Sequence, residues 1–90
     1  MRVRYSPRAA EDLENIRRYI GKNSQTSAWV VASFIRQWIA RLVQWPRSAR
    51  MTDAPGVRRL VVTNYPYVVY YEVTDGEVIV LTVLHSARER

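Results

Sequence analysis

Three apolar segments in the C-terminal part of the chain repeat with the two-residue period of β-strands. They cover residues 57–63, 67–74 and 78–84 and are rich in β-branched and aromatic side chains. Asp75-Gly76 separates the last two segments and is a typical hairpin turn, while Asn64, Tyr65 and Pro66 separate the first two. The pattern predicts an antiparallel three-stranded meander, which needs other elements to cover its apolar surface.

The first half of the chain has the signals of one short strand and two helices. Residues 2–5 alternate polar and apolar, and Ser6-Pro7 then supply a helix N-cap and a proline at the first helical position. Gly21 ends this helix, and a second helix is expected over residues 28–45, before Pro46. Residues 47–55 are expected to be a loop.

These elements predict a single α+β domain over residues 1–90. Its order is β-α-α-β-β-β, with a helical hairpin packed on one face of a small, mainly antiparallel sheet. The position of the first strand in the sheet stays open. Ninety residues bury only about 60–65% of their unfolded surface, so the core is small.

Both faces of the predicted sheet carry apolar side chains, although two helices cover only one of them. An antiparallel sheet with a solvated face normally places polar residues there. We therefore expect a partner segment to cover the second face or a groove beside it. The tryptophans are expected to lie mainly in the core, Trp38 most surely, with Trp29 the one most exposed at an interface.

The charge balance limits the classes of function. The chain has 14 basic and 8 acidic residues, a formal charge of +6, and Lys22 as its only lysine. Arginine binds carboxylates and phosphates well but transfers protons poorly. The sequence has no cysteine, no recognisable signal peptide and no apolar run long enough to span a membrane, so a cytoplasmic protein without metal or cofactor is expected.

Cationic side chains gather at strand positions. His85, the only histidine, and Arg88 follow the last predicted strand, and Arg58 and Arg59 lie next to each other in an earlier one. Strand ends often carry binding residues. His85 can equally be a surface residue, and at least one of the two adjacent arginines is expected either to pair with Asp53, Glu72 or Glu77 or to receive a partner.

The ordered set of motifs resembles the RelE/ParE superfamily of type II toxins over nearly the whole chain. The resemblance is carried by residues 2–9, Asp12-Leu13, Ile16, Trp45-Pro46, residues 56–62, residues 66–71 and residues 83–88. The last of these is more similar to the ParE branch than to the RelE branch. Ala49 departs from the family pattern, which often has glycine after the proline.

The resemblance implies a toxin that is neutralised by the C-terminal segment of a cognate antitoxin. ParE-like members inhibit DNA gyrase, so growth arrest without catalysis is expected, with Arg58, His85 and Arg88 as target-binding residues. The expected antitoxin-binding residues are Trp29, Phe34, Arg59, Tyr71 and Val73.

Two alternatives remain open. RelE-like members cleave mRNA in the ribosome, and here Arg58, Arg59, His85 and Arg88 would be the catalytic candidates. An RNase needs proton-transfer groups as well as cations, and His85 has no clear second proton-transfer partner in the sequence. Tyr67, Tyr70 and Tyr71 are possible substitutes, but they lie within a predicted strand. The other alternative is a protein-interaction module that is not toxic.

Overall fold

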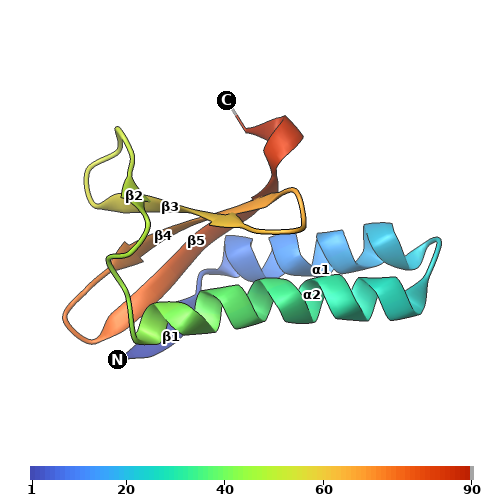
Figure 1. The fold of residues 1–90 in the computed structure, drawn as a ribbon, viewed down its shortest axis with the longest axis horizontal. Helices are drawn as coiled ribbons and strands as arrows, with labels where there is room; N and C mark the ends of the chain where they lie inside the picture. Colours follow the sequence, from blue (N-terminus) through green and yellow to red (C-terminus); the bar gives the residue numbers. More distant parts are fainter. Residues whose placement is uncertain (90) are drawn as a thin grey trace.

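The computed structural model describes residues 1–89 as two helices packed on one face of a five-stranded sheet (Figure 1). The sheet order is β1-β5-β4-β3-β2. Its elements are β1 (Arg2–Tyr5), α1 (Pro7–Gly21), α2 (Gln25–Ala40), η1 (Arg41–Val43), β2 (Arg50–Met51), β3 (Val57–Val62), β4 (Tyr67–Val73), β5 (Glu77–His85) and η2 (Ser86–Arg88). The predicted α+β class and the one-sided packing are confirmed.

The meander forms as the two-residue period predicts. β3 pairs antiparallel with β4, and β4 with β5. β1 joins the other edge of β5 in parallel, with Val3 opposite Val78 and Tyr5 opposite Val80. The first and last strands of the chain are therefore neighbours, which gives β1 the position that the sequence left open.

Both helices begin at serine caps. The Ser6 side chain accepts a hydrogen bond from the Ala9 amide at 3.0 Å, and its hydroxyl donates to the Leu81 carbonyl at 2.9 Å, which fixes the start of α1 against β5. The Ser24 side chain accepts from the Ser27 amide at 3.1 Å. This cap starts α2 at Gln25 rather than at the expected residue 28.

The second half of α2 also differs from the prediction. The α-helix ends at Ala40 and tightens into the short 3-10 helix η1, so Trp45 lies beyond both and is 57% exposed. Trp38 is half-buried and Trp29 is 70% exposed. Trp38 packs against the core and Trp29 is the most exposed tryptophan, as expected, but Trp45 is exposed rather than in the core because it lies beyond both helices.

The segment expected as a loop over residues 47–55 contains one more strand. Arg50 pairs with Arg59, and Met51 pairs with Arg58, at the edge of β3. The Arg58 guanidinium donates to the carbonyls of Ala49 at 2.8 Å and Arg47 at 3.2 Å. This side chain therefore holds the segment against the sheet.

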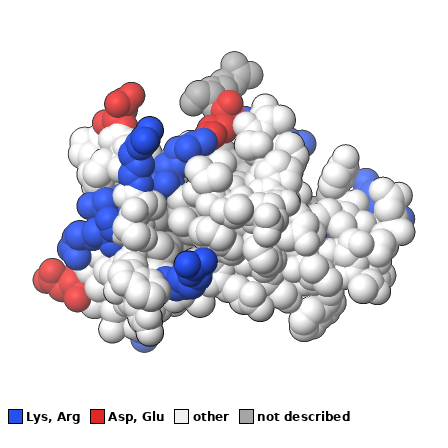
Figure 2. Space-filling view, in the orientation of Figure 1, with Lys and Arg blue, Asp and Glu red and all other residues white. Residues whose placement is uncertain are grey.

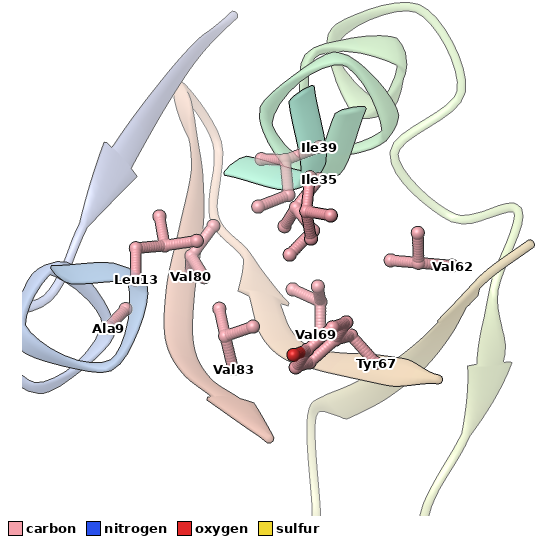
Figure 3. Packing of buried hydrophobic residues seen from close by; sticks show 10 residues of the cluster. Ala9, Leu13, Ile35, Ile39, Val62, Tyr67, Val69, Val80 and Val83 are labelled. Carbon is pink, nitrogen blue, oxygen red and sulfur yellow. The ribbon is translucent and has the colours of Figure 1, made fainter. Parts of the chain in front are cut away.

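The main core lies between the helices and the sheet. Figure 3 shows Leu13 of α1 beside Val80 of β5, with Ile35 and Ile39 of α2 on another side of the cluster. Ile35, Ile39, Val69 and Val80 are fully buried. Tyr71 is also fully buried, and its hydroxyl donates to the Pro46 carbonyl at 2.8 Å, which links the sheet to the chain just after α2.

The opposite face of the sheet is covered in part by the chain's own C-terminus. The tail leaves β5 on the side away from the helices (Figure 1). The residues on either side of Val68 in β4 point toward the helices, so Val68 itself points to the opposite face, where it is 1% exposed. Val61, its partner on β3, is 52% exposed. The sequence predicted that a partner covers this face, and the structure places one turn of the same chain on part of it.

Candidate functional site

A groove of about 590 Å³ lies between α1, the end of β5 and the tail. α1 contributes one wall, the ends of β4 and β5 form the floor, and η2 contributes the other wall. The lining residues are Asp12, Asn15, Ile16, Tyr19, Tyr67, Val83, Leu84, His85, Ala87 and Arg88. The groove thus contains both cationic residues that the sequence placed after the last strand.

The imidazole of His85 is held in a defined orientation. Its Nδ1 accepts a hydrogen bond from the Ala87 amide at 3.0 Å, which caps η2 and directs any proton of the neutral ring to Nε2. The ring meets the Tyr67 ring edge to face, with 5.4 Å between centroids. Burial raises the pKa of the Tyr67 hydroxyl above its ordinary value, so it remains protonated at neutral pH.

Asp12 joins α1 to the floor of the groove. Its Oδ2 accepts hydrogen bonds from the Thr82 hydroxyl at 2.6 Å and from the Val83 amide at 3.0 Å. The β4–β5 register shifts between Tyr70 and Tyr71, so β5 has an irregularity at this point. Asp12 bonds the Val83 amide there and keeps the groove floor against α1.

The α1 residues of the groove were missed by the sequence analysis. Asp12, Asn15, Ile16 and Tyr19 are separated by three, one and three positions, which is the spacing of one helical face. Asp12 and Ile16 were among the residues that carry the family resemblance, but no role in a site was expected of either. The spacing was a usable signal, but only together with the parallel β1–β5 pairing that brings α1 beside β5.

The two adjacent arginines do not join this groove. Arg58 bonds backbone carbonyls of residues 47 and 49. Arg59 points to the opposite face of the sheet, where it forms an ion pair with Glu89. Neither arginine forms the expected ion pair with Asp53, Glu72 or Glu77 among the described residues, and Glu77 instead binds Arg2 and Arg4 across the β1–β5 edge.

The residues expected to bind an antitoxin are spread over different environments. Trp29 is exposed on α2, and Phe34 is half-buried, with its ring 5.1 Å from that of Tyr65. Val73 is half-buried beside the second part of the core. Tyr71 is fully buried, so its expected direct contact with a partner is corrected: it has no accessible side chain to offer.

A second pocket lies where α2 ends against the sheet. It has a volume of about 310 Å³ and is lined by Trp38, Arg41, Leu42, Trp45, Ser48 and Leu60. The Arg41 guanidinium lies 4.7 Å over the Trp38 ring. Aromatic and aliphatic groups dominate this pocket, so it suits an apolar side chain better than a reaction that moves protons.

Positive charge is distributed unevenly over the surface. Figure 2 shows Lys and Arg side chains gathered at the β2–β3 end of one face, whereas the helical hairpin on that face is largely uncharged. Among residues 1–89, no helix is long and apolar enough to cross a bilayer.

Comparison with known proteins places these features in a family context. Residues 3–90 match the model of the family described as "ParE toxin of type II toxin-antitoxin system, parDE". "Putative toxin Y4kP" of Sinorhizobium fredii is 31% identical over 88 residues, covering 98% of this chain and 91% of that protein. "Toxin RelE2" of Caulobacter vibrioides is 38% identical over 81 residues, covering 90% of each.

The fold also has a solved counterpart. A chain of the structure titled "Chromosomal ParDE TA system from P. aeruginosa" superposes with a TM-score of 0.83 at 24% identity, covering 94% of this chain and 95% of that one. The similarities therefore extend over the helices, the sheet and the tail together.

Proposed function

The chain belongs to the ParE toxin family of type II toxin-antitoxin systems, and from this premise we propose that it arrests growth by binding DNA gyrase, without catalysing a reaction. A cognate antitoxin keeps it inactive. In this proposal the groove formed by α1 and the tail is the gyrase-binding site, and His85 and Arg88 are its contact residues.

The composition of the groove is the observation that favours binding over catalysis. RNA cleavage needs several cations at the developing phosphorane and two groups that exchange protons near neutral pH. The groove holds one imidazole and one guanidinium among the residues described, while Arg58 and Arg59 are engaged elsewhere. This set is better suited to contacting a protein surface than to cleaving RNA.

One observation favours the endoribonuclease alternative. Tyr67 packs against His85, and Tyr19 lines the same groove, so two phenols accompany the imidazole. From the sequence, Tyr67 was a possible substitute for the second proton-transfer group, although it lies within a strand. Because burial raises the pKa of the Tyr67 hydroxyl, it is protonated at neutral pH, so it can donate a hydrogen bond or act as a weak acid, but little phenolate is present to act as a base.

Two assays on the purified toxin separate these functions. We expect inhibition of gyrase supercoiling at stoichiometric concentrations and intact mRNA in a translating extract. His85→Ala and Arg88→Ala should each weaken gyrase inhibition roughly 10-fold or more, as loss of one charge-assisted contact does. The matched control is Arg8→Ala, which removes an exposed arginine outside the groove. Position-specific mRNA cleavage that disappears in His85→Ala would replace the gyrase proposal with the nuclease alternative.

We further propose that the antitoxin binds the exposed apolar side of α2 and the pocket at its end. Trp29 and Val30 are 70% and 50% exposed, and no charged residue occurs between Lys22 and Arg36. Trp45 and Arg41 border the pocket. An antitoxin segment with apolar anchors and acidic flanks would match both features. Antitoxin binding without growth arrest on induction would instead identify a non-toxic interaction module.

A further inference from the structure

Two side chains of the sheet bind a side-chain carboxylate of the tail. Arg59 of β3 and Tyr70 of β4 are directly opposite each other in the antiparallel register. The Arg59 Nη2 donates to Glu89 Oε1 at 2.6 Å, and both the Arg59 Nε and the Tyr70 hydroxyl donate to Glu89 Oε2. We call this three-residue arrangement, Arg59, Tyr70 and Glu89, the tail clamp.

The tail clamp is partly protected from water. The Glu89 side chain is 15% exposed and that of Arg59 is 38% exposed. The hydrogen bond from Arg59, followed by that from Tyr70, lowers the pKa of the Glu89 carboxyl to about 2. Glu89 is therefore ionised throughout the physiological range, and a bidentate arginine contact also fixes its orientation.

The clamp closes the second end of η2. At the first end, the Ser86 amide donates to the Pro66 carbonyl at 2.7 Å. Within the turn, the Ala87 amide bonds His85 Nδ1 and the Glu89 amide bonds the Ser86 carbonyl. A 3-10 turn of three residues has too few internal hydrogen bonds to persist alone, so its two attachments determine where it lies.

The position of η2 determines the shape of the groove. Ala87 and Arg88 supply the wall that faces α1, and Glu89 follows them directly. Release of Glu89 would leave that wall attached only at its first end, through the Ser86 and Ala87 amides. Arg59 and Tyr70 do not line the groove themselves, so their influence on it must act through the tail.

We infer that Arg59 and Tyr70 are positioning residues that, through Glu89, hold η2 as a wall of the groove and present Arg88 to the target. This inference rests on the proposal that the groove binds the target. Arg59 was expected to bind the antitoxin, and in this inference it instead binds a carboxylate of its own chain.

Amide hydrogen exchange tests the physical part of this inference independently of any target. In Arg59→Gln, Tyr70→Phe and Glu89→Gln, the Ala87 and Glu89 amides should exchange roughly tenfold faster than in the wild type, while the core amides of Val69 and Val80 stay unchanged. The matched control is Arg17→Gln, which breaks an ion pair with Glu14 on α1 and leaves the tail alone. Unchanged exchange at Ala87 and Glu89 in all three variants would overturn the inference.

Charge reversal separates positioning from a general loss of stability. Arg59→Glu alone should expose the tail and reduce growth arrest on induction, and Arg59→Glu combined with Glu89→Arg should restore both. A merely structural role for Arg59 in β3 would not be rescued by a change at residue 89. Failure of the double variant to recover tail protection, although each protein is folded, would contradict the clamp.

Growth arrest is measured beside gyrase inhibition so that the two proposals fail separately. A wild type that arrests growth but leaves gyrase active overturns the proposed target, and the clamp is then judged by growth arrest of the variants. A Glu89→Gln protein with an exposed tail and full toxicity overturns the positioning role. Reduced toxicity with unchanged antitoxin affinity supports it.

Discussion

Asp12 is the residue whose replacement should reveal most about how the groove is built. Its Oδ2 accepts from the Thr82 hydroxyl and from the Val83 amide, and Val83 is 2% exposed. In Asp12→Ala the Thr82 hydroxyl can rotate toward water, but the Val83 amide has lost its acceptor in a buried position. An unpaired buried donor costs about 1–3 kcal/mol, and a hydrogen bond to a charged group contributes about 1.5–3 kcal/mol.

These terms together predict a loss of about 3 kcal/mol for Asp12→Ala. Asp12→Asn keeps an oxygen acceptor but loses the charge, so it should cost about 1 kcal/mol. A domain of this size has a total stability of roughly 5–13 kcal/mol, and 1 kcal/mol corresponds to a shift of about 4–8 °C in Tm. The alanine variant should therefore melt more than 10 °C below the wild type, and the asparagine variant by about half that or less.

Urea unfolding monitored by circular dichroism measures the loss in free energy of unfolding for both Asp12 variants, with Glu11→Ala as the control. Glu11 is the neighbouring acidic residue on α1 and is exposed. It should change stability by less than about 0.5 kcal/mol. If Asp12→Ala unfolds at the same urea concentration as Glu11→Ala, the Asp12 contacts do not hold α1 to β5, and the account of the groove floor is wrong.

Three further outcomes follow from the structure. Tyr71→Phe removes the hydrogen bond to the Pro46 carbonyl without changing the packing of the ring, so thermal unfolding should show a loss of about 1 kcal/mol; no loss would mean that water replaces the hydroxyl. Trp29→Ala should leave stability within about 0.5 kcal/mol, because the side chain is exposed, but should weaken antitoxin binding in calorimetry, and unchanged affinity would remove Trp29 from that surface. The folded-state pKa of Glu89 is lowered, so its ion pair stabilises the fold above the ordinary carboxyl value of 4.5, and this contribution disappears as pH falls toward about 2. The stability difference between wild type and Glu89→Gln should accordingly be present at pH 7 and absent near pH 2. A difference independent of pH would mean that the ion pair of Glu89 does not stabilise the fold.

The parts of the fold that were predictable are those whose signals are local. The strand period, the Asp75-Gly76 turn and the Ser6-Pro7 cap each depend on residues close together in the chain, and the structure has the corresponding elements. The parallel pairing of β1 with β5 has no turn between the strands to announce it. For the same reason the contact between α1 and the end of β5 was not foreseen.

The candidate site was predictable to a similar extent. His85 and Arg88 follow directly from the end of an apolar strand, and both line the groove. Arg59 and Glu89 are 30 residues apart, and their ion pair depends on the tail turning back over the sheet. From the sequence alone, several carboxylates were candidate ion-pair partners of Arg59. The wrong ones were expected because the direction of the tail was unknown.

The placement of β5 between β1 and β4 has a consequence for the way the protein is made. During synthesis β1 leaves the ribosome before the other four strands of the described sheet, yet its neighbour in that sheet is β5, the last of the five to leave. A nascent chain that has reached Val73 contains the residues of both helices and of β3 and β4, but it lacks β5, which pairs with β1 and contacts α1. The sheet therefore cannot be completed, and α1 cannot pack on β5, until the strand that ends at His85 has been synthesised.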